Sequence, residues 1–311
     1  MAARVAVPIP VPAELREAIL DWYAARGRTL PFRDTTDPYA ILVSEAMAQQ
    51  TQAARAGEAW TRFMVTFPTV ESLAGAPPAD VLRAWQGLGY NRRAINLQRA
   101  ARIIVDEHGG QVPSDLASLE ALPGVGPYTA RAVAALAFGL PVGAVDTNVR
   151  RVLGRIVAGG VGVLDAPALQ AVADAAVPHD RPGFWTHALM DIGATLCHPR
   201  SPECDVCPAR PWCLHATDGL SGAAPPGSSP RATRETATPF VGTSRWLRGR
   251  IVERLRAVPN DEWVSIAGPI GDHDRAAVDR ALDALARDGL IVLETPADGL
   301  ATEPRRARLP T

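Results

Sequence analysis

The stretch ALPGVGPYTAR, residues 121–131, decides how this chain folds. Apolar residues precede it at helical spacing, and Ala- and Val-rich residues follow it at the same spacing. Its two glycines allow a tight turn and the close approach of another backbone, so the stretch predicts two helices joined by a hairpin. The exposed N–H groups that begin the outgoing helix form a site for an anion. LPGVG is also compatible with an ordinary helical corner.

The helical pattern continues on both sides of this hairpin. Short breaks rich in Pro, Gly, Asp or Ser separate the helical segments, and no stretch before residue 217 alternates as a strand does. The chain therefore predicts a mainly α fold and no transmembrane helix. Helices are expected at 13–25, 38–48, 56–65, 79–86, 94–106, 129–138, 147–157, 166–176 and 183–196.

The last third of the chain has a different character. Residues 217–242 are rich in Gly, Pro, Ser and Thr, and they predict a flexible linker. Residues 243–311 predict two helices and a strand at 290–294, an order that resembles a winged helix. The first of these helices, TSRWLRGRIVERLR at 243–256, carries five arginines and one glutamate. Such a helix binds phosphates without reading a base, forms a solvated basic face, or docks on protein.

The composition says more about which reactions the side chains can carry out than about which partner the protein binds. The net charge is −1, which alone gives no indication of nucleic acid binding. All 32 basic residues are arginine, and the chain has no lysine. Because arginine stays protonated, no side chain can form a Schiff base. The N-terminal segment carries prolines where a signal peptide needs an apolar helix, so we expect a cytoplasmic, nucleoid-associated protein.

The cysteines form one compact group. All four lie in CHPRSPECDVCPARPWC, residues 197–213, as C-x6-C-x2-C-x5-C. Disulfides are uncommon inside cells, and zinc sites generally use two ligand pairs separated by a longer insert. One CxxC flanked by two single cysteines favours a [4Fe–4S] cluster held by Cys197, Cys204, Cys207 and Cys213, with zinc as the alternative. We expect the nearby His198 and His215 to be surface residues rather than ligands.

Two carboxyl groups stand out among the acids. Asp146 comes directly before a helical pattern, where it caps the helix and where the helix dipole favours a negative charge. Glu45 lies inside the apolar helix PYAILVSEAMA, so burial should raise its pKa. Taken alone, either residue also fits a structural role. Together they supply one protonated acid and one anion, as acid-assisted glycosidic cleavage requires.

In combination, these motifs resemble the helix-hairpin-helix DNA glycosylases, and specifically the MutY family of adenine DNA glycosylases. The resemblance covers about residues 13–216 and rests on the cysteine spacing, LPGVGPYTA, VDTN and SEAMAQQT. It implies two helical lobes around a DNA cleft. One is a six-helix barrel at 30–137, and the other combines 1–29 with 138–216 and carries the cluster. Residues 217–311 do not match the β-rich Nudix-like domain of many members.

The resemblance also implies a mechanism. Related bifunctional enzymes such as endonuclease III have a lysine at the position of Tyr128, and that lysine leads to strand cleavage. A phenol here, in a chain without lysine, implies a glycosylase that only removes the base. Glu45 would protonate the flipped adenine, Asp146 would stabilise the oxocarbenium-like sugar, and Asn148 would help position the site.

Further residues are assigned by the same resemblance. Arg28, Arg33 and His187 would line the adenine pocket, although family members commonly have Glu or Gln at the position of His187. Contacts to DNA would come from Gln50, Thr51, Leu88, Tyr90, Gly124, Val125 and Gly126. The implied substrate is double-stranded DNA with adenine opposite 8-oxoguanine or guanine, bound by a monomer. A thymine- or uracil-specific mismatch glycosylase and a non-catalytic DNA-binding Fe–S protein are the alternatives.

Overall fold

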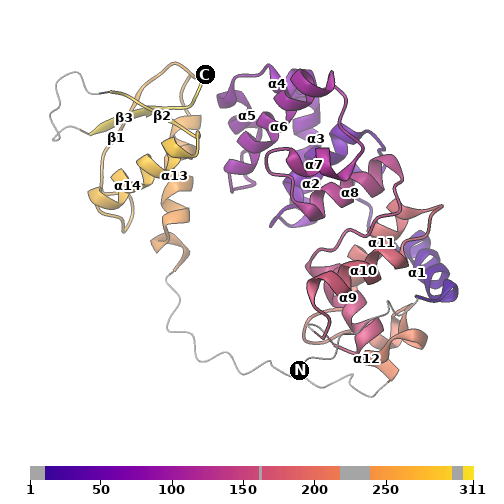
Figure 1. Ribbon diagram of the computed structural model, residues 1–311. Helices are drawn as coiled ribbons and strands as arrows, with labels where there is room; N and C mark the ends of the chain where they lie inside the picture. The colour runs from indigo at the N-terminus through magenta and orange to yellow at the C-terminus, as the bar shows by residue number, and fades with distance from the viewer. Residues whose placement is uncertain (1–10, 161–162, 218–238, 296–303) are drawn as a thin grey trace. The chain divides into compact units, whose positions relative to one another are not determined.

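The computed structural model describes residues 11–160, 163–217, 239–295 and 304–311 (Figure 1). The chain divides into two compact units. The first contains Met1–Glu45, Val112–Ala121 and Val125–Arg231, and the second contains Ala46–Gln111, Leu122–Gly124 and Ala232–Thr311. No helix in the described part of the chain is long and apolar enough to cross a membrane.

The first unit is built from helices that bury one apolar side each. Leu15 and Ile19 of the N-terminal helix share a core with Val152, Ile156 and other residues of the later helices. The N-terminal helix α1 packs on α11, and α11 also contacts α8 and α9. The elements are α1 (Ala13–Arg26), η1 (Pro31–Arg33), α2 (Pro38–Ala48), α7 (Leu116–Ala121), α8 (Pro127–Phe138), α9 (Thr147–Ala158), α10 (Ala166–Ala176), α11 (Pro182–Thr195), η2 (Cys204–Val206), η3 (Arg210–Trp212) and α12 (Leu214–Thr217). Helix α2 continues into the second unit after Glu45.

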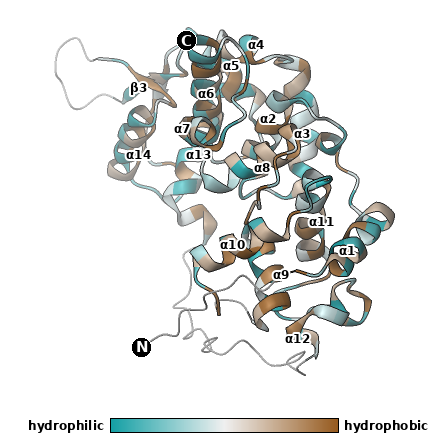
Figure 2. Cartoon of the chain, turned by 45° about the vertical axis from the view of Figure 1, so that its right-hand side comes forward, coloured by the Kyte–Doolittle hydropathy of each residue, from teal (hydrophilic) through white to brown (hydrophobic). Residues whose placement is uncertain are grey.

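The second unit combines the helices between residues 46 and 111 with the C-terminal module. Helix α6 packs on α4 and α5, and α13 packs on α14 and α5. Helices such as α6 and α14 are apolar on one side and polar on the other (Figure 2). The elements are α3 (Ala53–Thr66), α4 (Val70–Ala74), α5 (Pro78–Ala84), α6 (Arg92–His108), η4 (Phe240–Gly242), α13 (Ser244–Arg256), β1 (Val264–Ile266), α14 (Arg275–Arg287), β2 (Val292–Leu293) and β3 (Arg305–Arg308).

The predicted hairpin is present, but its two glycines have different roles. Gly124 has φ +84°, and a Cβ on it would lie 3.0 Å from the Cβ of Asn96, so this position needs glycine. Gly126 is the N-cap of α8 with an ordinary φ of −99°, and Pro127 begins the helix. The turn therefore depends on Gly124, whereas Gly126 has no such constraint.

Several short elements were not expected from the sequence. The helices α4, α7 and α12 are too short to show a clear apolar period. The described residues of the C-terminal module form three antiparallel strands in the order β1-β3-β2, where the sequence predicted one strand. Register pairs Ser265 with Arg306 and Val292 with Arg308, and strands of two to four residues carry little alternation to read. Most of the predicted linker, 218–238, lies outside the described residues. The lobe boundaries and the winged-helix assignment stay predictions.

Candidate active site

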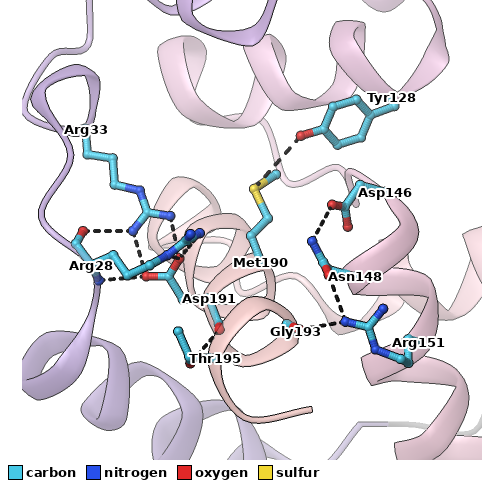
Figure 3. Close-up of polar contacts among 10 residues, drawn as sticks. All are labelled: Arg28, Arg33, Tyr128, Asp146, Asn148, Arg151, Met190, Asp191, Gly193 and Thr195. Carbon is cyan, nitrogen blue, oxygen red and sulfur yellow. Dashed lines mark hydrogen bonds and ion pairs between the residues drawn. The ribbon is translucent and has the colours of Figure 1, made fainter. Parts of the chain in front are cut away.

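Asp146 is the N-cap of α9, as its position in the sequence predicts. One of its carboxylate oxygens accepts the backbone N–H of Val149 at 2.7 Å, and the other accepts Nδ2 of Asn148 at 3.1 Å. The apolar residues of α9, among them Val152 and Ile156, are buried and hold the helix start in place. Asp146 is thus a carboxylate with both oxygens fixed by hydrogen bonds. Figure 3 shows the one from Asn148.

Glu45 lies near the end of α2, and its neighbours in the helix are mostly apolar. The residue is only 8% exposed. Burial raises the pKa of the Glu45 carboxyl to about 7, and the charge of Asp146 adds to this effect. A hydrogen bond with Tyr128 and the charge of Arg33 act in the opposite direction on the same pKa. The predicted rise in pKa is therefore confirmed, and at neutral pH a large fraction of this carboxyl keeps its proton.

Tyr128 is the second residue of α8, directly after the hairpin, and it interacts with these acids. Its phenol is hydrogen-bonded with Glu45, and its hydroxyl lies 3.9 Å from Sδ of Met190 (Figure 3). Burial raises the pKa of the phenol well above its usual range, and the charges of Glu45 and Asp146 raise it further. Tyr128 consequently stays neutral and acts as a hydrogen-bonding group.

Asn148 also contacts two residues other than Asp146. Arg151 binds its side-chain oxygen, and Gly193 packs closely against it. Nη2 of Arg151 donates to Oδ1 of Asn148 at 2.8 Å and to the Gly193 carbonyl at 2.6 Å. A Cβ on Gly193 would lie 2.5 Å from the Cβ of Asn148, so the two segments can meet only because residue 193 is glycine. With its oxygen engaged by Arg151, Asn148 presents its nitrogen to Asp146 (Figure 3).

Arg28 and Arg33 share a partner that sequence reasoning missed. Asp191 on α11 has no exposed surface, and Arg33 binds both of its carboxylate oxygens, at 2.6 and 2.7 Å. Arg28 adds bonds from its backbone N–H at 2.8 Å and from Nε at 2.7 Å. Hydrogen bonds from Arg33 and Arg28 lower the pKa of Asp191 despite its burial. A buried acid in the apolar helix FWTHALMDIGAT is the only signal in the sequence that could have indicated this partner.

His187, also on α11, lies beside the same cationic pair. Its ring centroid is 6.2 Å from that of Tyr23, and the guanidinium of Arg33 lies 5.6 Å from the Tyr23 centroid. Burial lowers the pKa of His187 to about 3, and the charges of Arg33 and Arg28 contribute. His187 is therefore a neutral imidazole at physiological pH and can both donate and accept one hydrogen bond.

The four cysteines converge on one cavity. Cys197, Cys204, Cys207 and Cys213 all line it, together with apolar side chains of α9 and α11. Burial raises the pKa of the Cys207 thiol to about 11, so the thiolate form needs a cationic group beside it.

Buried polar groups of the first unit face the same cavity. Arg155 is 5% exposed and donates from Nη1 to Sγ of Cys197 at 3.1 Å. The sequence expectation for His215 is wrong, because this residue is buried and its Nδ1 lies 3.0 Å from the Gly159 carbonyl. Four thiols beside a buried cation are the chemistry that such a group needs, but no three His, Cys, Asp or Glu side chains in the described part of the chain are placed to hold a metal ion.

The predicted DNA-contacting residues of the second unit lie in two loops. Gln50 and Thr51 follow α2, and Leu88 and Tyr90 precede α6. Gln50 is exposed and Tyr90 is 42% exposed, whereas Leu88 is only 6% exposed. Gln50 has φ +55° and Tyr90 has φ +45°, which is the left-handed region that side chains other than glycine rarely adopt. The sequence gives no sign of this backbone strain.

The basic helix α13 is engaged with protein at several positions. Arg245 donates to the hydroxyl of Tyr90, and Arg248 pairs with Asp288. Arg250 pairs with Glu253 at 2.7 Å, and Arg256 donates to Oδ1 of Asn91 at 2.8 Å. These partners favour a docked helix over a solvated basic face. Phosphate binding by α13 stays a prediction.

Taken together, the first unit holds a buried carboxyl with a raised pKa, a carboxylate fixed by hydrogen bonds and a neutral phenol beside each other. Such a set can protonate a leaving group and stabilise a positive charge that develops on a sugar.

The chain is similar to known proteins in sequence and in fold. The model of the HhH-GPD superfamily base excision DNA repair protein matches residues 43–160, a range that contains Glu45, Tyr128 and Asp146. The adenine DNA glycosylase of Mycobacterium tuberculosis is 42% identical over 277 residues, which is 88% of each chain. The structure of a thermostable thymine-DNA glycosylase is 32% identical with a TM-score of 0.62, covering 65% of this chain and 95% of that chain. A non-covalent endonuclease III–DNA complex, 23% identical with a TM-score of 0.57, covers 66% of this chain and 94% of that one and shares the fold.

Proposed function

The chain belongs to the adenine DNA glycosylase family, an enzyme family of base excision repair, and we propose that it removes adenine mispaired with 8-oxoguanine or guanine. We further propose that it hydrolyses only the N-glycosidic bond and leaves the DNA strand intact. The observation that carries the proposal is the buried Glu45 carboxyl, with a pKa of about 7, coupled to Asp146 and hydrogen-bonded with Tyr128.

Each residue of this group has a distinct role in the proposed reaction. Glu45 donates its proton to the ring of the flipped adenine, which makes the base a better leaving group. Asp146, fixed at the start of α9 by its bond with the Val149 N–H, stabilises the positive charge that develops on the sugar. Tyr128 packs beside the nucleoside, and Asn148 fixes the orientation of the Asp146 carboxylate. Water then completes the hydrolysis and leaves an abasic site.

The adenine pocket is proposed to lie beside Arg28, Arg33 and His187. The ion pair of Arg33 with Asp191 holds that guanidinium in place, while the Arg28 side chain is 34% exposed. A neutral His187 can accept from the amino group of adenine or donate to a ring nitrogen.

A panel of duplexes tests the substrate. The protein is incubated with A·8-oxoguanine, A·G, A·C, T·G and U·G duplexes, and alkali then cleaves any abasic site. We expect product from A·8-oxoguanine and A·G. Product from T·G and U·G alone would instead support a thymine- or uracil-specific enzyme, a possibility kept open by the thymine-DNA glycosylase structure at 32% identity. DNA binding without product in any lane would support the non-catalytic alternative.

Excision should slow as the pH rises through the pKa of Glu45. The group acts in its protonated form, and burial raises its pKa to about 7, so activity is expected below that pH and is lost above it. His187, with a pKa of about 3, does not change charge in this range. Single-turnover excision rates measured from about pH 5.5 to about pH 9, on both sides of neutrality, check this expected decline. A rate that rises through pH 7 would contradict a general-acid role.

Borohydride should not trap an internal Schiff base between the protein and its product DNA. The reason is that no side-chain amine can react, since the chain contains no lysine and only the N-terminal amine is available. Strand cleavage should follow only when base or heat is added. Peptide mapping after borohydride treatment checks the claim, and an adduct on any internal residue would contradict it.

We also propose that Cys197, Cys204, Cys207 and Cys213 hold a [4Fe–4S] cluster. Support comes from four thiols that line one cavity and from the buried Arg155 guanidinium beside Cys197. When bound, the cluster would cross-link the loop at 197–213 and would offset part of the negative charge of the four thiolates that hold it. Arg151 joins this loop to the site, because its Nε donates to the Cys197 carbonyl at 2.6 Å and its Nη2 binds Asn148.

The purified protein should be yellow-brown with about four irons per chain. Cys207→Ser should lower the iron content and the thermal midpoint, because this buried thiol needs a metal to ionise. His198→Ala is the control, since this half-buried histidine of the same loop lies 3.6 Å from Glu203, is not one of the four thiols and should keep full iron. Iron and zinc analysis after anaerobic purification decides the question, and stoichiometric zinc in a colourless protein would exclude the cluster.

The proposed working form is a monomer bound to duplex DNA in the cytoplasm, at the nucleoid. Its DNA contacts would include the hairpin residues Gly124, Val125 and Gly126, which precede the N-terminus of α8.

A further inference from the structure

We propose that Arg93 is the positioning residue of the opposing-base site, because its single guanidinium holds both loops that carry the proposed DNA contacts. This inference rests on the proposed function and on the family resemblance, which places Gln50, Thr51, Leu88 and Tyr90 at positions that contact the base opposite adenine.

Arg93 binds the first loop at the end of α2. Its Nη1 donates to the carbonyls of Ala46 at 2.9 Å and Met47 at 3.0 Å, and also to the carbonyl of Gln49. Carbonyls in the last turn of a helix lack partners inside that helix, so the guanidinium caps α2. Its Nη2 donates to Oγ1 of Thr51 at 3.2 Å. These bonds lie on both sides of Gln50, whose φ is +55°.

Arg93 binds the second loop with the same terminal nitrogen. Nη2 donates to the carbonyls of Leu88 at 3.2 Å and Gly89 at 3.3 Å, directly before Tyr90 with its φ of +45°. The guanidinium also lies 5.4 Å from the ring centroid of Trp85 and 5.5 Å from that of Tyr90. Two strained residues in different loops thus share one anchor. Strain of this kind persists only where the surroundings over-determine the backbone.

The chemistry of Arg93 differs from that of an ordinary DNA-binding arginine. No carboxylate lies within ion-pair distance of it in the described part of the chain, and its partners are carbonyls, a hydroxyl and aromatic rings. Its neighbour Arg92 is 66% exposed and lies 3.7 Å from Asp288. Arg93 is therefore oriented inward, toward the loops, while Arg92 is the solvent-exposed cation of the pair.

Both loops open on the same groove of about 1090 Å³, which Gln49, Gln50, Leu88 and Tyr90 line with Arg93. A planar guanidinium with five donors can bridge two loops, whereas a lysine ammonium has three donors at one point. Arg93→Lys keeps the positive charge and removes the bridge. The variant thus separates positioning from electrostatic attraction to DNA.

The test compares Arg93→Lys with Arg92→Lys, a matched substitution one residue away. We expect Arg93→Lys to slow single-turnover excision from the A·8-oxoguanine duplex roughly tenfold to a hundredfold, the cost of a small misplacement. Arg92→Lys should stay within about twofold of the parent, because a solvated cation is replaced by another. Equal losses in the two variants, or no loss in Arg93→Lys, would overturn the proposal.

A second measurement does not depend on excision. Amide hydrogen exchange in the protein without DNA should speed up at 49–51 and 87–91 in Arg93→Lys and not in Arg92→Lys. Unchanged exchange at both loops would overturn the proposal even if activity fell. If the parent protein excised no adenine from any duplex, the proposed function would fail while this exchange result still judged the role of Arg93 in the loops.

Chemical rescue provides the last check, with Arg93→Ala as the variant. Millimolar guanidinium chloride, far below denaturing concentrations, should restore most of the lost excision rate by occupying the vacated donor position. Ammonium chloride at the same concentration should not. Equal responses to the two salts in a folded variant would contradict the bridging role.

Discussion

Glu45→Gln is expected to reduce adenine excision by about 10²–10⁴-fold, the usual contribution of a positioned general acid. Glutamine keeps the size of the side chain and a hydrogen-bonding partner for Tyr128, but it has no proton to donate. Affinity for the mispaired duplex should remain within a few fold, because the change removes no charge from the DNA-contacting surface. Single-turnover excision and fluorescence anisotropy measure the two quantities.

The matched control is Glu14→Gln, which makes the same change at an exposed residue in the first turn of α1. It should retain the excision rate of the parent. In Glu45→Gln, any residual activity should also lose the decline through pH 7, because the titrating group is gone. Full activity in this variant would exclude Glu45 as the acid.

Asp146→Asn is expected to lower the excision rate by roughly 10²–10³-fold, a loss typical for removal of a preorganised electrostatic group. Asparagine is as good an N-cap as aspartate, so the bond from the Val149 N–H and the start of α9 should persist. What disappears is the negative charge that is proposed to stabilise the sugar. The thermal midpoint should therefore change little while the rate falls.

Asp165→Asn controls for the cap itself. Asp165 is the N-cap of α10 and accepts the Ala168 N–H at 2.8 Å, so it has the same local role without the neighbouring acid. This variant should keep both stability and activity. A stability loss of similar size in the two variants, with activity in proportion, would assign Asp146 a purely structural role.

The elements of this fold that could be predicted depend on local spacing. Helices such as α9 and α11 were predicted to within two residues because their buried residues recur every three or four positions. Asp146 was predicted as an N-cap because capping depends on the next three residues alone. The short strands of the C-terminal module escaped prediction because pairing of Ser265 with Arg306 joins residues far apart in the chain.

In the candidate site, too, the features that could be predicted depend on residues close together in the sequence, and the features that could not depend on distant residues. The raised pKa of Glu45 follows from apolar neighbours in its own helix, and the four cysteines lie in one short loop. Asp191 could not be assigned, because its partners Arg28 and Arg33 are separated from it by about 160 residues of chain. The burial of His215 escaped prediction for a related reason, since a polar side chain is buried only where a distant carbonyl accepts its hydrogen bond.

The sequence by itself determined the hairpin, the acid pair, the thiol group and the absence of any lysine that could form a Schiff base. Each of these follows from residue type and from spacing within a few turns of helix. Only the tertiary structure decided that Asp191 anchors Arg33, that His187 is neutral and that Arg93 holds two loops in left-handed conformations. The physical reason is that burial, ion pairing and backbone strain are properties of an environment. That environment exists only once segments distant in sequence have packed together.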